Sequence, residues 1–211
     1  VVTPDGPLDL SIFALDTLSA SGNITINAAG NVLAKASMDA HGEDSAITIE
    51  STGGDVQVGD DLPQNPMIFD VVEITATDSI EITAAGSVTI GESATLRTTA
   101  EGSDVPDIAV TAEGGTLDVE GNVHAAHAAE LSADGDITIT GQVTAQNSVI
   151  NVTAGTSGTG SVFVERPTEG ALGGILKTLG AEGSIAIGAG ASGGDIALLN
   201  ANVETYSLDL D

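Results

Sequence analysis

The chain alternates apolar and polar residues in short stretches, and many of these stretches follow a glycine and a small polar residue. The phrase occurs at Gly22-Asn23-Ile24-Thr25-Ile26, Gly86-Ser87-Val88-Thr89-Ile90 and Gly135-Asp136-Ile137-Thr138-Ile139. Alternation with a period of two predicts a strand with one buried face, and the glycine with its polar neighbour predicts a turn. Strands this short cannot bury a face alone, so the repetition favours copies that stack on one another.

The repeat is clearest between Ile108 and Ala145, where three short strands occur twice in succession. Corresponding positions such as Leu117 and Ile137 lie 20 residues apart. A coil of about 20 residues with three strands is the size of one turn of a right-handed parallel β-helix. We therefore predict an all-β fold, a right-handed parallel β-helix or β-solenoid, with roughly seven to nine coils.

The alternation also predicts which side chains face the interior, because successive residues of a strand point to opposite sides. The flanking residues of each stretch are predicted to point inward: Ile24, Ile26, Val56, Val58, Ile80, Ile82, Val88, Ile90, Ile137, Ile139, Ile185 and Ile187. The middle residues are predicted to face water: Thr25, Gln57, Glu81, Thr89, Asp118 and Thr138.

Three proline-containing segments interrupt the repeat, near residues 60–69, 93–107 and 166–182. Proline cannot donate to a central ladder, so these loop insertions are expected to leave the coil and lie outside it. Because no linker or change of composition divides the chain, residues 1–211 are predicted to form a single β-solenoid domain. The chain opens on Val1 without a charged leader and its last residues alternate like a strand, so we expect a segment of a longer protein.

The composition of the chain limits the classes of partner that it is expected to bind. There are 31 acidic residues against four basic ones, Lys35, Arg97, Arg166 and Lys177, which gives a formal net charge of −27. Nucleic acid binding requires clustered Lys and Arg, so no nucleic acid partner is expected. No stretch reaches the roughly 18 apolar residues of a membrane helix, so no membrane insertion is expected. The chain has no Cys, which excludes a disulfide scaffold.

A surface this acidic prefers cations. Carboxylates gather in three predicted turns, as Asp60 with Asp61, as Glu101 with Asp104 and Asp107, and as Asp134 with Asp136. Calcium takes about six to eight oxygen ligands, which turn carboxylates and backbone carbonyls supply. These seven residues are our candidates for calcium, the one cofactor considered. The alternative is that they are solvated turn acids.

A second candidate metal site has the spacing His124-x-x-His127-x-x-Glu130. On a helix this spacing would align three ligands for a transition metal. The local sequence Val123-His124-Ala125 is typical of a strand, however, with His124 at the outward position. We interpret both histidines as solvated.

The sequence does not predict catalysis. No nucleophile elbow, phosphate loop or Ser/His/Asp set can be assembled from it. Enzymes that cleave sugars on a β-helix need paired acids or a basic residue together with aromatic platforms. The four bases do not cluster along the sequence, and the aromatic residues Phe13, Phe69, Phe163 and Tyr206 are scattered. The chain is therefore predicted not to be an enzyme.

Two runs resemble a known family. Ser21-Gly22-Asn23-Ile24-Thr25-Ile26-Asn27-Ala28-Ala29-Gly30 and Asp78-Ser79-Ile80-Glu81-Ile82-Thr83-Ala84-Ala85-Gly86 are similar to repeats of filamentous haemagglutinin-like exoproteins. These are very large bacterial surface adhesins. The resemblance implies a right-handed β-helical shaft, an extracellular or cell-surface location, and a role in attachment.

We therefore expect a structural or adhesive β-helical shaft of a large secreted or cell-surface bacterial protein, stabilised by calcium if the turn carboxylates bind it. The expected partners are a host or neighbouring-cell surface, or copies of the chain joined end to end into filaments, because an open β-helix leaves unpaired ladders at both ends. The alternative is a carbohydrate-binding or carbohydrate-cleaving β-helix of the tailspike or polysaccharide-lyase type, which would need a groove with aromatic platforms and paired acids.

Overall fold

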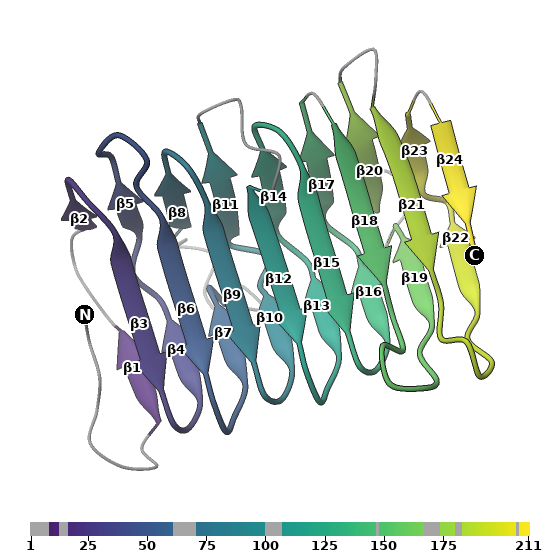
Figure 1. The fold of residues 1–211 in the computed structure, drawn as a ribbon, viewed down its shortest axis with the longest axis horizontal. Helices are drawn as coiled ribbons and strands as arrows, with labels where there is room; N and C mark the ends of the chain where they lie inside the picture. The colour runs from purple at the N-terminus through teal and green to yellow at the C-terminus, as the bar shows by residue number, and fades with distance from the viewer. Residues whose placement is uncertain are drawn as a thin grey trace.

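The described part of the chain is a right-handed parallel β-helix built from three sheets of eight strands each. The computed structural model describes residues 9–12, 17–60, 71–99, 107–146, 148–166, 174–179, 183–205 and 207–211. Its coils follow one another along the long axis, with the first strands at one end and the last at the other (Figure 1). The predicted fold class is confirmed, and the eight coils fall within the predicted range.

The three sheets are named A, B and C. Sheet A contains β3 (Ile24–Ala28), β6 (Ile47–Ser51), β9 (Ile80–Ala84), β12 (Ile108–Ala112), β15 (Ala129–Ala133), β18 (Val149–Thr153), β21 (Ser184–Gly188) and β24 (Ser207–Leu210). Sheet B contains β1 (Leu10–Ile12), β4 (Val32–Ala34), β7 (Val56–Val58), β10 (Val88–Ile90), β13 (Leu117–Val119), β16 (Ile137–Ile139), β19 (Val162–Glu165) and β22 (Ile196–Leu199). Sheet C contains β2 (Leu18–Ala20), β5 (Met38–Ala40), β8 (Val72–Ala76), β11 (Ala94–Thr98), β14 (Asn122–Ala125), β17 (Gln142–Ala145), β20 (Ile175–Thr178) and β23 (Asn202–Glu204).

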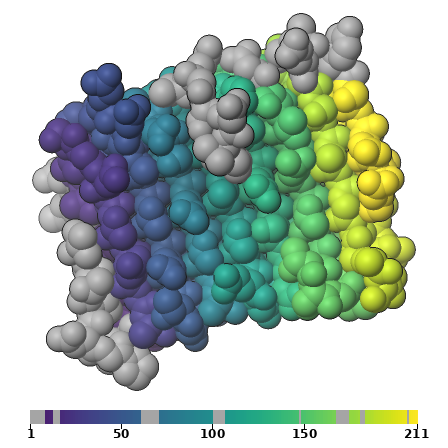
Figure 2. Space-filling model, in the orientation of Figure 1, coloured from purple at the N-terminus to yellow at the C-terminus, as the bar shows by residue number. Residues whose placement is uncertain are grey.

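Each coil passes through sheet B, then sheet C, then sheet A, and one such coil is called a rung. In sheet B the distance along the chain from one rung to the next ranges from 20 residues between Leu117 and Ile137 to 34 residues between Val162 and Ile196. The rungs appear as successive coloured bands across the face of the molecule in Figure 2. Among the described residues no helix has the length and apolar character needed to cross a membrane.

The core is a column of aliphatic side chains that runs through all three sheets. Ile49, Ile82 and Val110 stack in register in β6, β9 and β12, and each is 0% exposed. The twelve residues predicted to point inward are all buried, while the six predicted to face water are not. Alternation along each strand therefore identifies the buried face correctly, because register between rungs places apolar residues on apolar residues.

Two of the three segments predicted as insertions contain strands, so those boundaries are wrong. β11 (Ala94–Thr98) lies inside the segment 93–107, and β20 (Ile175–Thr178) lies inside 166–182. In both strands the inward position at the end is a buried threonine, Thr98 or Thr178, which weakens the apolar alternation. Pairing with the strands on either side keeps β11 and β20 in sheet C despite this weaker alternation. Residues 61–70, 100–106, 167–173 and 180–182 of the predicted insertions lie outside the described part of the chain.

The small polar residue in the turn from sheet A to sheet B links each rung to the next. Asn31 Oδ1 accepts a hydrogen bond from the Asp55 N–H at 2.8 Å, and Asp55 Oδ1 accepts one from the Ser87 N–H at 2.8 Å. Ser87 Oγ in turn accepts one from the Thr116 N–H at 3.1 Å. Backbone N–H groups need a partner wherever they leave the sheet ladder. We call this series the corner ladder; it explains why the repeat places a short oxygen-bearing side chain before the strand.

Replacing Asp55 by Ala should remove one step of the corner ladder. The Ser87 N–H would lose its acceptor, so its hydrogen exchange should become faster and the free energy of unfolding should fall by about 1 kcal/mol. Asp55→Asn retains the accepting oxygen and should behave like the native chain. Amide exchange followed by NMR measures both effects, and unchanged exchange at Ser87 in Asp55→Ala would contradict the assignment.

Candidate functional site

The outward side chains of sheet C form a continuous polar row. The strands are in register, so the middle positions lie one above another at a spacing of about 4.8 Å. This row, which we call the sheet C stripe, consists of Ser19, Asp39, Thr75, Arg97, His124, Thr144, Lys177 and Glu204. Every rung therefore contributes one side chain that can donate or accept a hydrogen bond.

The basic residues lie together on this side of the molecule. Arg97 and Lys177 belong to the stripe, while Lys35 directly follows β4 and Arg166 directly follows β19, both at the turn from sheet B to sheet C. On the described strands of sheets A and B, the outward charged side chains are acidic: Glu50, Glu81, Asp118, Glu130 and Asp209, with Glu165 at the end of β19. The winding of the coil therefore brings the four basic residues to one side of the molecule, although they remain spread from the second rung to the seventh.

A shallow open hollow of about 370 Å³ lies over β2, β5 and β8, at the N-terminal end of the sheet C stripe. The polar residues that line it are Thr17, Ser19, Ser37, Asp39, Glu73 and Thr75. Ser37 Oγ accepts a hydrogen bond from the Glu73 N–H at 3.0 Å and donates to the Val71 carbonyl at 3.3 Å. The hollow thus combines the hydroxyl groups of Thr17, Ser19, Ser37 and Thr75 with two carboxylates, and Ser37 also fixes its β8 edge.

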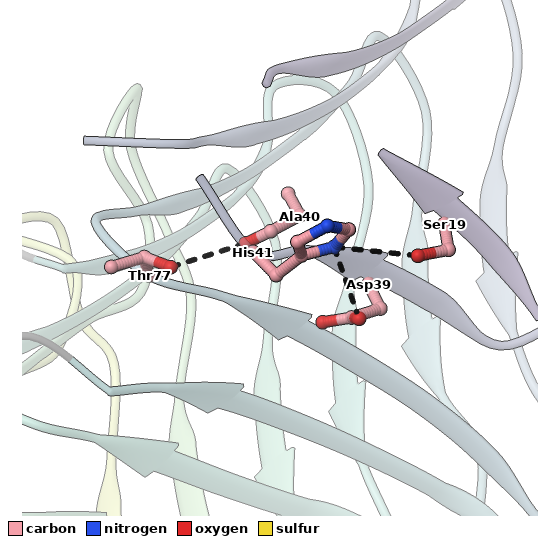
Figure 3. A network of polar contacts seen from close by, with 5 residues as sticks. All are labelled: Ser19, Asp39, Ala40, His41 and Thr77. Carbon is pink, nitrogen blue, oxygen red and sulfur yellow. Dashed lines mark hydrogen bonds and ion pairs between the residues drawn. The ribbon is translucent and has the colours of Figure 1, made fainter. Parts of the chain in front are cut away.

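A small polar network borders this hollow (Figure 3). His41 Nδ1 lies 3.3 Å from Ser19 Oγ and 3.4 Å from Asp39 Oδ2, and Thr77 Oγ1 donates to the Ala40 carbonyl at 3.3 Å. A catalytic Ser-His-Asp relay needs the hydroxyl and the carboxylate on opposite ring nitrogens. Here both approach Nδ1, so this geometry positions the Asp39 carboxylate rather than activating Ser19.

The two cations of the stripe differ in their surroundings. Lys177 Nζ forms an ion pair with Glu204 Oε2 at 2.5 Å, whereas the exposed Arg97 has no ion-pair partner among the described residues. Beside it, His124 Nδ1 lies 2.7 Å from Thr144 Oγ1. Burial lowers the pKa of His124, and the positive charge of Arg97 lowers this pKa further. His124 is therefore held in its neutral form near pH 7.

The described calcium candidates do not converge on one site. Asp60 forms an ion pair with Lys35, Asp134 Oδ1 accepts from the Ser157 N–H at 2.8 Å, and Asp136 Oδ1 accepts from the Ser161 N–H at 2.8 Å. In the described ranges no three His, Asp or Glu side chains gather in a metal-binding arrangement. Asp61, Glu101 and Asp104 lie outside the described residues.

Asp107, the remaining candidate, is a buried carboxylate at the turn before β12 and is 1% exposed. Its Oδ2 accepts a hydrogen bond from the His127 N–H and another from Thr98 Oγ1 at 3.4 Å, while its Oδ1 has no hydrogen-bond partner among the described residues. Desolvation raises the pKa of Asp107 above its ordinary value, although the hydrogen bonds oppose this effect. Asp107 therefore holds the turn from sheet C to sheet A by its hydrogen bonds, although burial disfavours its charged form.

This raised pKa predicts a pH dependence of stability. A carboxyl group whose pKa is higher in the folded state stabilises that state below pH 3.8, and the contribution is lost as the pH rises through the folded pKa. Relative to Asp107→Asn, the native chain should therefore lose free energy of unfolding as the pH rises above about 4. Urea unfolding of both chains across this pH range measures the difference. A difference that is constant or grows with pH would contradict the shift.

The three residues of the His124-x-x-His127-x-x-Glu130 motif point to different parts of the surface. His124 is an outward residue of β14, His127 lies in the following turn, and Glu130 is exposed on the outer face of β15 in sheet A. The strand interpretation of this segment is confirmed, and the helical ligand spacing does not form.

Comparison with known proteins identifies no relative of this chain. Neither a protein-family model, nor a curated protein, nor a solved structure matches the chain.

Proposed function

We propose that the chain is a rigid structural and adhesive shaft of a large secreted or cell-surface bacterial protein. The observation that carries this proposal is the continuity of three parallel sheets through eight rungs around one aliphatic core. Each rung is held by ladders in all three sheets, and the corner ladder adds side-chain links between several of them. Such a stack resists bending because every inner rung is fixed to both neighbours.

The distribution of polar side chains supports attachment by the flank of the shaft. The sheet C stripe begins at an open, shallow hollow, and its polar groups follow the long axis from rung to rung. An extended surface of this kind suits a partner that lies along the shaft.

The last rung supports growth of the shaft. There β22, β23 and β24 each pair with a strand on one side, and Leu198, Leu208 and Leu210 are between 36% and 47% exposed. The equivalent inward residues of the preceding rung, Val164, Ile185 and Ile187, are at most 1% exposed. One further rung, from additional chain or from a second copy, would bury this apolar surface, and burial of apolar surface favours such a contact.

The attachment proposal is tested with beads that carry the chain of residues 1–211. We expect these beads to adhere to host epithelial cells or to bacterial cells under flow more strongly than beads coated with an unrelated acidic protein of similar net charge. Reducing-end release from bacterial and plant polysaccharides is measured in parallel. Adhesion no stronger than the control on every cell type would contradict the proposal, and sugar release would favour the carbohydrate-cleaving alternative.

A further inference from the structure

We propose that the part of the sheet C stripe between Ser19 and His124 binds a short oligosaccharide that carries one carboxylate. Arg97 would hold the carboxylate, and the hollow over β2, β5 and β8 would hold the sugar hydroxyls. This inference rests on the proposed adhesive function, and it names the adhesive face and the chemical class of its ligand.

Arg97 is the first of the two groups that define this site, because none of the described acidic residues forms an ion pair with it. The chain contains 31 acidic residues, and Lys35 and Lys177 both form ion pairs with them, yet the exposed Arg97 forms none within the described residues. Its partners in register on the two neighbouring strands are Thr75 and His124, neither of which is acidic. A guanidinium presents a planar pair of donors that matches a carboxylate in two parallel hydrogen bonds.

The groups around Arg97 add neutral hydrogen-bonding partners. Thr95 and Asn122 are in register on β11 and β14, and each lies two residues before Arg97 or His124 on its own strand. His124 is kept neutral by burial and by Arg97, so it does not bring a second positive charge to the patch. A single carboxylate beside uncharged donors and acceptors therefore fits this part of the stripe better than a dense array of anionic groups.

The hollow supplies the second part of the argument. Asp39 and Glu73 are strong acceptors for hydroxyl groups, and Ser19 and Thr75 both donate and accept. Asp39 is also oriented by its contact with His41 (Figure 3). A polyhydroxylated ligand satisfies such a mixture, whereas an apolar ligand would leave these polar groups without partners.

The spacing joins the two parts into one site. Asp39, Thr75 and Arg97 are consecutive members of the stripe, so Asp39 and Arg97 lie two rungs apart, or about 10 Å. This separation suits a ligand of two or three sugar rings laid along the shaft. A long polyanion is disfavoured, because Asp39 and Glu73 at one end and Glu204 at the other would repel it.

The binding test uses two acidic oligosaccharides and their neutral counterparts: 3′-sialyllactose with lactose, and cellobiouronic acid with cellobiose. NMR titration of the chain measures each dissociation constant. We expect at least one acidic sugar to bind about tenfold more tightly than its neutral counterpart. Arg97→Gln should weaken that binding about tenfold, and Arg97→Lys, which keeps the charge but not the planar fork, should weaken it less.

Matched variants separate local contacts from overall charge. Lys177→Gln makes the same charge change on the same stripe, three rungs from Arg97, and should leave binding unchanged. Asp39→Asn should weaken binding of the acidic and neutral sugars together, whereas Asp209→Asn on sheet A should not. Occupancy should also raise the pKa of His124 in the native chain, because the bound carboxylate offsets the charge of Arg97.

Three results would overturn the inference: no binding of either acidic sugar at millimolar concentration, equal binding of acidic and neutral sugars, or equal effects of Arg97→Gln and Lys177→Gln. The bead experiment separates this failure from failure of the proposed function. If native and Arg97→Gln beads adhere equally well, the chain is adhesive through another surface. If native beads do not adhere, the adhesive function itself is wrong.

Discussion

Replacing Ile82 by Ala should lower the free energy of unfolding by about 3 kcal/mol. Ile82 is 0% exposed in β9, and its side chain is stacked between Ile49 of the rung before and Val110 of the rung after. The truncation removes three carbon atoms from a column that has paired strands on both sides, so the cavity cannot close without moving backbone ladders. Urea unfolding followed by circular dichroism measures the loss.

The neighbouring residue provides the control for this prediction. Glu81 belongs to the same strand but is exposed on the outer face, so Glu81→Ala should change the free energy of unfolding by less than about 0.5 kcal/mol. Equal losses for Ile82→Ala and Glu81→Ala would contradict the assignment of inward and outward faces, on which the register of the whole stack depends.

Gly141→Ala should be the second strongly destabilising change, with an expected loss of about 3 kcal/mol. Gly141 is buried at the turn between sheets B and C, and a Cβ atom there would lie 1.9 Å from the Gly121 carbonyl oxygen and 2.5 Å from that of Glu120. Both obstacles are backbone atoms of the preceding rung, so no side-chain rotation relieves the overlap. The rungs would have to separate at this corner.

Gly22→Ala is the matched control, because a Cβ atom at Gly22 meets no atom within 4 Å. This substitution also reduces the freedom of the unfolded chain, so we expect no loss or a gain of about 0.5 kcal/mol. Thermal and urea unfolding of both variants make the comparison. If Gly141→Ala is as stable as Gly22→Ala, the close approach of the rungs at this corner is wrong.

The fold was predictable because its strongest signal is local. Alternation in stretches such as Ile80–Ile82 and Ile137–Ile139 identifies strands and their buried sides, and the glycine phrases mark the turns. Stacking then follows from physics, since strands of three to five residues cannot form a core singly. Within the described residues the predicted inward and outward positions hold throughout.

The candidate site was not predictable by the same means. Its basic residues Arg97 and Lys177 lie on β11 and β20, inside segments that Pro106 and Pro167 predict to be insertions. The buried Thr98 and Thr178 also weaken the apolar alternation that would identify these strands. With those strands missing, the register that places Arg97 beside His124 could not be derived. Residues far apart in the sequence become neighbours in a solenoid through rung number, and rung number depends on every insertion length.

The calcium candidates illustrate a different ambiguity. A turn carboxylate such as Asp134 or Asp136 can coordinate a cation or accept a hydrogen bond from a backbone N–H, and its sequence context is the same in both cases. In the structure each of these two residues accepts a hydrogen bond from an N–H of the following rung. The sequence therefore shows where carboxylates occur, but it does not show which groups of the neighbouring rung lie within hydrogen-bonding distance of them.

The corner ladder gives the molecule a direction. In each link the accepting oxygen belongs to the earlier rung and the donating N–H to the later one, as in Asn31 to Asp55 and Asp136 to Ser161. At this corner, therefore, the two ends of the stack differ: one presents N–H donors and the other presents side-chain acceptors. Copies joined through this contact would all point the same way, so the resulting fibre would be polar and would lack twofold axes across its length.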